Sequence, residues 1–468
     1  MSRKRKILPV FENVEILDTG SEGKAIARVD NRVIFVPFAV PGDICDIRVT
    51  NKKKSYMLGR IEKLRKASEL RTEPRCKHFG LCGGCKWQNM QYRHQLRFKQ
   101  KQVEDNFRRI GKLNFPSIRP ILASPDIFHY RNKMEFTFSN RKWITDTSGG
   151  RLSEDEMKGL GFHLPGMFSR ILDLDECFLQ DNPSNAIRLA IKEYAVRNKL
   201  SFYNVLDWTG FLRNLIIRNT STGALMLIIS VNEDREEDLF PMLDFIKGHF
   251  PEITSMHYVI NTKKNPDLSD QKIILYHGAS YIRETMEHLT FRIAPKSFFQ
   301  TNYKQALRMY QLTSEFASLK GNETVYDLYT GTGTIANFIA GKASRVVGIE
   351  YLEDAVRDAR ENSKLNGITN TEFFAGDMSK ILTMDFIKQH GRPDIVITDP
   401  PRAGMSPDVI HQLLLAAPEK IAYISCNPAT QARDLALLSE CYEIKEVQPI
   451  DMFPHTQHVE NMAMLVRK

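Results

Sequence analysis

The sequence predicts a multidomain protein in which a small N-terminal β-barrel precedes a central α+β domain and a C-terminal α/β domain with a doubly wound parallel sheet. Three observations lead to this fold class. The 468 residues exceed the length at which a single hydrophobic core usually stops growing. Short strand patterns separated by turn residues fill the first 66 residues. From about residue 322 onward, strand and helix patterns alternate.

The composition is that of a folded protein with a polyanionic partner. Hydrophobic residues make up 42% of the chain and charged residues 26%, which is ordinary globular usage and argues against a disordered or fibrous chain. The net charge is +9, and basic residues crowd two segments, 52–54 and 93–112. Such clusters suit phosphate binding, although solvated helix faces carry the same residue types.

The sequence also bears on location. No apolar run reaches membrane-spanning length, and residues 1–6 lack the apolar core of a signal peptide. We therefore expect a cytoplasmic protein that contacts no membrane and needs no obligate protein partner. In a reducing compartment the seven cysteines do not predict disulfides, and closely spaced ones predict a metal or catalytic site instead.

The N-terminal segment has the pattern of a barrel. Strands are expected at 14–17, 25–29, 33–37, 44–49 and 57–62, with glycines, Asp30-Asn31 and Pro41-Gly42-Asp43 between them. Five strands in so short a segment form a small closed or half-closed, OB-like barrel, which is either purely structural or displays an RNA-binding face. Gly20-x-x-Gly23 and Val40-Pro-Gly-Asp43 resemble the TRAM domain, an accessory RNA-binding barrel.

Four cysteines form the candidate metal set. Cys76-x5-Cys82-x2-Cys85 lies among glycines that leave the backbone room to fold around a ligand, and Cys177 follows far downstream. Four thiolates satisfy a zinc ion or a 4Fe-4S cluster, and three clustered ligands with one distant ligand favour the cluster. Reduced surface thiols are the alternative.

The segment between the cysteines and the C-terminal domain predicts mixed structure. Residues 91–112 read as a helix with one apolar face, and prolines at 116, 120 and 125 follow it. Strands are expected at 133–139, 214–218 and 224–231, and a helix at 185–199.

The first half of the C-terminal domain predicts an adenosine site. A buried strand at 323–328 leads into a tight turn with Gly331 and Gly333, and the next strand ends in Glu350. Such an acid can accept both ribose hydroxyls, and Asp377 after the third strand suits the adenine edge. The third glycine of a dinucleotide fingerprint is absent, which favours S-adenosylmethionine over NAD.

The second half of this domain offers the chemistry. Asp399-Pro-Pro-Arg402 and then Cys426 follow buried strands, so both lie at the edge where open sheets bind ligands. Carbon 5 of uracil is a poor nucleophile unless a thiolate first adds to carbon 6, and a base must later remove the carbon 5 proton. Cys426 offers the thiolate and Glu460 the base. A core cysteine and a solvated strand-end glutamate are the alternatives.

At this point the sequence resembles the RNA uracil-C5 methyltransferase family. The resemblance lies in four segments: Ser297-Phe-Phe-Gln-Thr-Asn302, Asp399-Pro-Pro-Arg-Ala-Gly404, Ser425-Cys-Asn-Pro-Ala-Thr430 and His458-Val-Glu-Asn-Met-Ala463. With the TRAM-like barrel and the four cysteines, it is closest to the branch that methylates 23S ribosomal RNA. Where that family often has asparagine in its cofactor loop, this chain has Thr334.

The resemblance implies a class I methyltransferase with a Rossmann-like sheet and assigns roles to individual residues. It implies that Cys426 is the nucleophile, Glu460 the general base, and the four cysteines the ligands of a 4Fe-4S cluster. The residues implied to line the cofactor and target-base pocket are Gln300, Tyr329, Glu350, Asp377 and Asp399. The implied domains are a TRAM barrel (1–66), an iron–sulfur domain (67–90 and 125–285) and a methyltransferase domain (91–124 and 286–468).

The expected reaction is therefore methylation of a flipped uridine in structured RNA, most consistent with 23S ribosomal RNA. Two alternatives stay open. The same chemistry could act on transfer RNA, or the chain could be a non-catalytic iron–sulfur protein that binds RNA or senses redox state.

Overall fold

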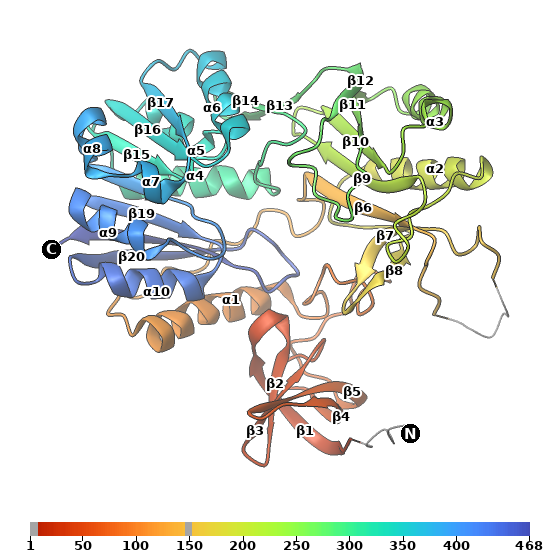
Figure 1. Cartoon of the computed structure of the whole chain (residues 1–468). Coiled ribbons are helices and arrows are strands. Elements are labelled where there is room, and N and C mark those ends of the chain that lie inside the picture. Colours follow the sequence, from red (N-terminus) through yellow and green to blue (C-terminus); the bar gives the residue numbers. More distant parts are fainter. Residues whose placement is uncertain (1–7, 146–151) are drawn as a thin grey trace. The chain divides into compact units, whose positions relative to one another are not determined.

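The computed structural model describes residues 8–145 and 152–468. Residues 1–6, which lack the apolar core of a signal peptide, lie outside the described part. The chain forms two compact units. The first comprises residues 1–101 and 453–458, and the second comprises 102–452 and 459–468. Figure 1 shows the elements of both.

The first unit contains a closed five-stranded barrel, as predicted (Figure 1). Its strands pair in the order β1-β2-β3-β5-β4 and are β1 (Val10–Thr19), β2 (Ala25–Val29), β3 (Arg32–Val36), β4 (Ile44–Lys52) and β5 (Tyr56–Lys66). A two-residue turn joins β2 to β3, and both Asp30 and Asn31 have the positive φ that such hairpins require. Alternate residues, including Ala27 and Ile34, fill the interior. Closure leaves no open strand edge.

The second unit contains a seven-stranded central sheet. Its order is β12-β11-β10-β9-β6-β7-β8, and the strands are β6 (Lys133–Ser139), β7 (Gly159–Leu164), β8 (Met167–Asp173), β9 (Leu212–Asn219), β10 (Leu225–Val231), β11 (Ile253–Ile260) and β12 (Ile274–Gly278). Helices α2 (Ser184–Arg197) and α3 (Glu236–His249) pack together through Tyr194 and Phe245, whose ring centroids lie 4.7 Å apart. The strands and the helix predicted for this region are confirmed. A hairpin of β13 (Ile282–Met286) and β14 (Leu289–Ile293) follows.

The same unit contains the predicted doubly wound sheet, here called the catalytic sheet. Its order is β17-β16-β15-β18-β19-β21-β20, and its strands are β15 (Thr324–Leu328), β16 (Arg345–Glu350), β17 (Thr371–Ala375), β18 (Ile395–Thr398), β19 (Lys420–Ser425), β20 (Tyr442–Ile450) and β21 (Glu460–Arg467). The first five strands run parallel, and β21 pairs antiparallel with both β19 and β20. The catalytic sheet thus has a parallel part that resembles a nucleotide-binding fold and an antiparallel edge.

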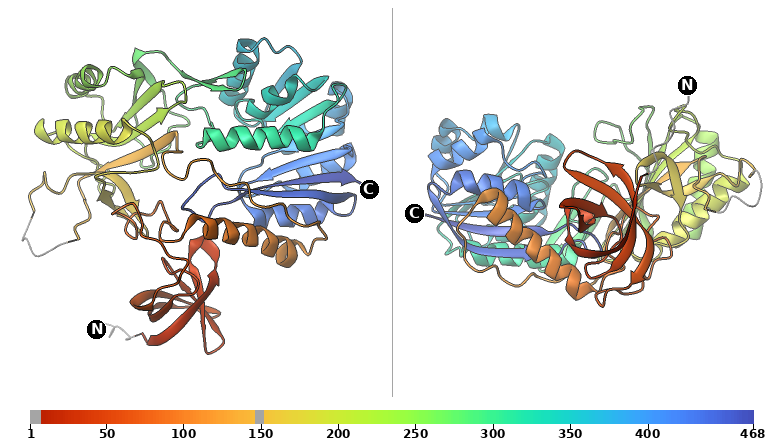
Figure 2. Two further views of the ribbon diagram at one scale, coloured as in Figure 1. Left: turned by 180° about the vertical axis from the view of Figure 1, so that it is seen from behind. Right: turned by 90° about the horizontal axis from the view of Figure 1, so that it is seen from below.

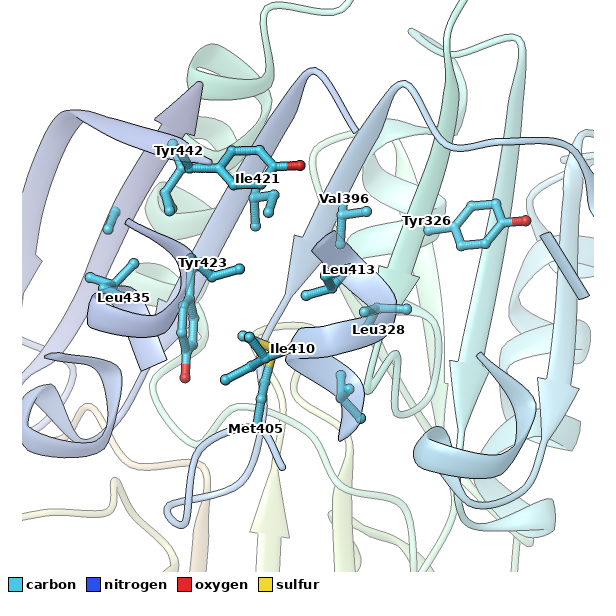
Figure 3. Packing of buried hydrophobic residues seen from close by; sticks show 14 of the residues in the cluster. Tyr326, Leu328, Val396, Met405, Ile410, Leu413, Ile421, Tyr423, Leu435 and Tyr442 are labelled. Atoms are coloured by element: carbon cyan, nitrogen blue, oxygen red, sulfur yellow. The ribbon is translucent and has the colours of Figure 1, made fainter. Parts of the chain in front are cut away.

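Helices cover both faces of the catalytic sheet. They are α4 (Tyr303–Ala317), α5 (Thr334–Ala340), α6 (Glu353–Leu365), α7 (Met378–Ile381), α8 (Met384–His390), α9 (Pro407–Ala416) and α10 (Pro428–Leu438). In Figure 3, Val396 and Ile421 of the sheet pack against Leu413 of α9 and Leu435 of α10. The left view of Figure 2 shows α4 across the opposite face, where it contacts β19 and β21.

The predicted helix at 91–112 is confirmed as α1 (Tyr92–Asn106) followed by a π-helical turn at Phe107–Gly111. Val103 and Phe107 are fully buried in the core of the catalytic sheet, and Leu113, Phe115 and Ile118 pack against that core. None of the helices in residues 8–145 and 152–468 is long and apolar enough to cross a membrane.

Candidate active site

The carboxyl ends of the parallel strands bring several predicted site residues to one edge of the catalytic sheet. Tyr329 follows β15, Glu350 ends β16, Asp399 follows β18, and Cys426 follows β19. The strands are mostly buried and apolar, so the residues at and just beyond their carboxyl ends are the ones delivered to the edge. Ligands bind at this edge in open parallel sheets.

The loop after β15 is shaped for close approach of a ligand. Tyr329, Gly331 and Gly333 all have positive φ angles, of 62°, 56° and 73°. A Cβ atom on Gly333 would lie 2.9 Å from Cβ of Ala359, so the position also requires glycine for space. Glu350 holds the loop, because its Oε2 accepts a hydrogen bond from the Gly331 amide at 3.0 Å.

Glu350 retains capacity for a ligand. Its Oε1 accepts one further hydrogen bond, from the Leu352 amide at 3.1 Å. An ionised carboxylate offers about four acceptor positions. Two acceptor positions of Glu350 therefore stay available for hydroxyl groups. The predicted contact with both ribose hydroxyls of the cofactor requires two such positions.

The remaining predicted cofactor residues lie on other elements of the second unit. Asp377 caps α7 by accepting hydrogen bonds from the amide and hydroxyl of Ser379, at 3.0 and 2.8 Å. Gln300 precedes α4, and its backbone carbonyl accepts a hydrogen bond from Asn132 Nδ2 at 3.0 Å. Burial, and then the charges of Asp434, Asp377 and Glu350, raise the pKa of Tyr329 to about 12. Tyr329 therefore lies among the acidic residues of this edge.

Asp327 is a buried acid that the sequence analysis did not single out. Its Oδ2 accepts hydrogen bonds from the Thr330 hydroxyl at 2.5 Å and the Ala336 amide at 3.1 Å. Its Oδ1 is buried and has no hydrogen-bond partner among the described residues. Burial, with the charges of Asp399 and Glu350, raises the pKa of Asp327 to about 7. A buried acid with an open acceptor suits a cationic ligand such as S-adenosylmethionine.

Cys426 and Glu460 come together through strand pairing. In the β19–β21 register Ser425 is opposite Asn461, and Cys426 and Glu460 are the residues that adjoin this pair on the two strands. Glu460 is the first residue of β21, whereas the sequence pattern placed it just before the last strand. Its side chain is buried, with 5% of its surface exposed.

The cysteine lies in an acidic environment. Burial, and then the charges of Glu460 and Asp399, raise the pKa of the Cys426 thiol to about 11. Burial and Asp399 raise the pKa of Glu460 to about 8, and burial raises that of Asp399 to about 7. These three residues share one site. Asp399 disfavours ionisation of both Glu460 and Cys426, and Glu460 disfavours ionisation of Cys426.

Arg402 is the cation of this site, and its role was missed from the sequence. It hydrogen-bonds to Cys426, and its charge opposes the rise in the pKa values of both Cys426 and Glu460. Helix α10 fixes its backbone, since Asn427 Nδ2 and Thr430 Oγ1 donate to the Arg402 carbonyl at 3.0 and 3.1 Å. In the sequence Arg402 stands out only as the last residue of Asp399-Pro-Pro-Arg402.

Comparison with known proteins identifies the family. Residues 267–468 match the model for tRNA (Uracil-5-)-methyltransferase, and residues 12–61 match the TRAM domain. An uncharacterized RNA methyltransferase of Bacteroides thetaiotaomicron is 52% identical, covering 95% of this chain and 99% of its own length. One of Porphyromonas gingivalis is also 52% identical, covering 97% and 99%. The chain belongs to the RNA (uracil-5-)-methyltransferase family.

A solved structure agrees with this assignment. The Pyrococcus abyssi tRNA (uracil-54, C5)-methyltransferase in complex with S-adenosyl-L-homocysteine is 29% identical, with a TM-score of 0.76 over 97% of this chain and 100% of that chain. The predictions of an S-adenosylmethionine-dependent RNA (uracil-5-)-methyltransferase and of a TRAM barrel are confirmed. The alternative of a non-catalytic RNA-binding or redox-sensing protein is therefore set aside.

The predicted cluster ligands are divided between the two units. Cys76, Cys82 and Cys85 belong to the first unit and Cys177 to the second. Cys82 Sγ accepts a hydrogen bond from the Gly84 amide at 3.4 Å, and Cys85 Sγ accepts one from Gln88 Nε2 at 3.3 Å. Among the described residues, no group of three or more His, Cys, Asp or Glu side chains is arranged to hold a metal ion.

Proposed function

We propose that this RNA methyltransferase works through a covalent bond between Cys426 and carbon 6 of the target uracil, with Glu460 as the general base. The observation that carries the proposal is the shared site of Cys426, Glu460, Asp399 and Arg402 at the carboxyl edge of the catalytic sheet. Cys426 is hydrogen-bonded to Arg402, and the charges of Glu460 and Arg402 act on each other and on the thiol, so a nucleophile, a base and a cation, the parts that this reaction needs, share one site.

The steps follow from the chemistry of uracil. The Cys426 thiol gives its proton to solvent water, and its sulfur bonds to carbon 6, which moves the electron pair of the 5,6 double bond onto carbon 5 and the carbon 4 carbonyl. Carbon 5 then takes the methyl group that S-adenosylmethionine would supply when bound, and S-adenosylhomocysteine would be left. Glu460 then takes the carbon 5 proton, the 5,6 double bond re-forms, and the thiolate of Cys426 leaves.

Charge balance in the site controls the first step. With a pKa of about 11, only about one Cys426 in ten thousand is a thiolate at pH 7 in the free protein. Asp399 and Glu460, with pKa values of about 7 and 8, limit further negative charge. Arg402 is the chain's own cation here, so it stabilises the thiolate and orients it.

The residues proposed to hold the cofactor and the target base are Gln300, Tyr329, Glu350, Asp377 and Asp399. The polar groups of these residues suit S-adenosylmethionine. Glu350 keeps acceptor positions for hydroxyl groups, and the open acceptor of Asp327 adds a site for positive charge. Asp399 lies beside the nucleophile, where a carboxyl group can bind the polar edge of uracil.

We propose 23S ribosomal RNA as the substrate, on the resemblance of the four cysteines to that branch of the family. Transfer RNA is the second candidate. It is favoured by the archaeal enzyme of known structure, whose substrate is tRNA uracil 54, and by the name of the matching family model.

The four cysteines are proposed to hold a 4Fe-4S cluster. Hydrogen bonds from Gly84 and Gln88 to two of the sulfurs suit thiolate ligands, which accept such bonds readily. We also keep the proposed division into a barrel (1–66), an iron–sulfur domain (67–90 and 125–285) and a methyltransferase domain (91–124 and 286–468).

Methyl transfer from tritiated cofactor to unmodified transcripts of 23S ribosomal RNA and of tRNA tests the substrate. We expect incorporation into the ribosomal transcript, as 5-methyluridine, and incorporation into tRNA alone would replace the proposal by its second candidate. Cys426→Ala should abolish transfer and leave cofactor binding within about twofold of wild type. Retained transfer by this variant would overturn the covalent mechanism.

A further inference from the structure

A second cavity lies in the central sheet, at the ends of β6 and β9, and it shares no residue with the acidic site. Its volume is about 370 Å³, within the usual range for sites that bind small ligands or single groups. Polar side chains from five segments line it, among them Glu135, Asn214, Tyr203, Arg213 and Lys264.

Two buried polar atoms at this cavity lack partners. Tyr203 Oη and Arg213 Nε make no hydrogen bond within the described residues, although the two side chains are only 6% and 2% exposed. A buried group left without a partner costs about 1–3 kcal/mol. Each of these two atoms can gain a partner from a bound ligand or from an ordered water.

The Arg213 guanidinium is held in place. It donates hydrogen bonds to the carbonyls of Asn261, Lys263 and Asn265, and its central carbon lies 4.3 Å from the ring centroid of Tyr203. A fixed cation stacked on an aromatic ring suits a planar, polar ligand.

An exposed tryptophan stands at the rim. Trp208 is 48% exposed and has a φ angle of 58°, an uncommon conformation for a bulky residue. Its amide donates to the Asn204 carbonyl at 2.8 Å, and a Cβ on the nearby Gly210 would lie 2.3 Å from the Phe202 carbonyl oxygen. The tight turn thus holds the indole outward, with Lys264 Nζ 3.5 Å from its ring centroid.

We propose that this cavity is a second RNA subsite, which receives one unstacked base of the substrate other than the methylated uridine. Asn214 and Glu135 offer a donor and acceptors to the edge of a base, Tyr203 and Arg213 offer a stacked surface, and Trp208 with Lys264 holds the neighbouring nucleotide. Proteins that read RNA in loops bind splayed bases with this combination of groups.

The cavity is linked to the active site through one strand. Asn214 and Arg218 point to the same face of β9, four residues and thus about 13 Å apart. Arg218 Nη2 donates to the Ser297 carbonyl at 2.7 Å, at the start of the loop that carries Gln300. One bound RNA loop can therefore reach both places. The inference rests on the family's RNA substrate and not on the covalent mechanism.

The test compares three variants of the full-length protein. Tyr203→Phe removes only the unpartnered hydroxyl, and Trp208→Ala removes the rim aromatic. The control, Tyr276→Phe, removes a hydroxyl on β12 of the same sheet, outside the cavity, where Tyr276 already donates to the Phe240 carbonyl at 3.4 Å. Binding of the 23S ribosomal RNA and tRNA transcripts is measured by fluorescence anisotropy, with cofactor affinity and melting temperature alongside.

We expect affinity for the substrate transcript to fall about fivefold with Tyr203→Phe and at least tenfold with Trp208→Ala. The control should stay within twofold, and all variants should keep wild-type cofactor affinity. Because the Tyr203 hydroxyl has no partner in the protein, its removal should not lower the melting temperature. RNA affinity within twofold of wild type in both cavity variants would overturn the proposal.

Photo-cross-linking keeps the inference testable if a variant folds poorly. Transcripts that contain 4-thiouridine and 6-thioguanosine are irradiated with the Cys426→Ala protein, which separates this result from the covalent chemistry. Adducts in peptides 201–214 or 261–272 support the subsite, and their absence while other peptides cross-link contradicts it. If AMP, GMP or UMP binds the cavity as tightly as the RNA does, the site belongs to a small molecule and the proposal fails.

Discussion

Arg402 should control the reactivity of Cys426, and this can be measured without RNA. Arg402→Gln removes a cation that stabilises the thiolate. It leaves the backbone contacts of the loop, which Asn427 and Thr430 make to a carbonyl. An opposite charge at contact distance lowers an acid's pKa by about 1–3 units. Since Arg402 is an exposed residue, we take about one unit, which is about tenfold less thiolate at a fixed pH below 11.

The assay is alkylation by iodoacetamide at pH 9, followed by mass spectrometry of the cysteine peptides. The exposed Cys441 serves as an internal control whose rate should not change. Glu460→Gln should have the opposite effect on Cys426. It removes a carboxylate that is ionised above its pKa of about 8 and that disfavours the thiolate. Cys426 should react about tenfold more slowly in Arg402→Gln and several-fold faster in Glu460→Gln. Rates within twofold of wild type in both variants would refute the electrostatic account.

Three further predictions concern the same edge of the catalytic sheet. Glu460→Gln should trap a methylated RNA–protein adduct stable in denaturing gels, because the carbon 5 proton then has no base; a variant that turns over normally would remove Glu460 from its role. Glu350→Gln should weaken cofactor binding about tenfold or more by calorimetry, and an unchanged affinity would contradict the assignment of the ribose contact. The pKa of Asp327 is raised from 3.8 to about 7, so its contribution to stability is lost as pH rises through 7. We therefore expect the difference in free energy of unfolding between Asp327→Asn and wild type to favour the variant by about 3 kcal/mol more at pH 8 than at pH 5. The measurement is denaturant unfolding of the cofactor-free protein. A pH-independent difference would show that the buried acid is not the cause.

Much of the fold could be predicted because its signals are local. The barrel strands alternate buried and exposed residues between turns such as Asp30-Asn31, and the parallel strands of the catalytic sheet are continuous apolar runs. For the same reason Glu350, Asp399 and Cys426 could be placed at one edge, since each ends or directly follows such a run.

The rest depends on contacts between distant segments. Nothing near Glu460 in the sequence shows that antiparallel pairing of β21 with β19 brings it to the site of Cys426. The burial of Asp327 and the contact of Arg402 with the cysteine likewise arise only when several strands and α10 meet. The cavity beside β6 and β9 is built from five segments, none of which carries a recognisable motif.

A substrate that cannot complete the reaction tests the central claim most directly. RNA in which 5-fluorouridine replaces uridine offers no carbon 5 proton, so after methyl transfer the bond between sulfur and carbon 6 cannot be released. Incubation with cofactor, nuclease digestion and peptide mass spectrometry should find a methylated fluorouridine on Cys426. A nucleotide on another residue, or no adduct under conditions in which ordinary RNA is methylated, would contradict the account.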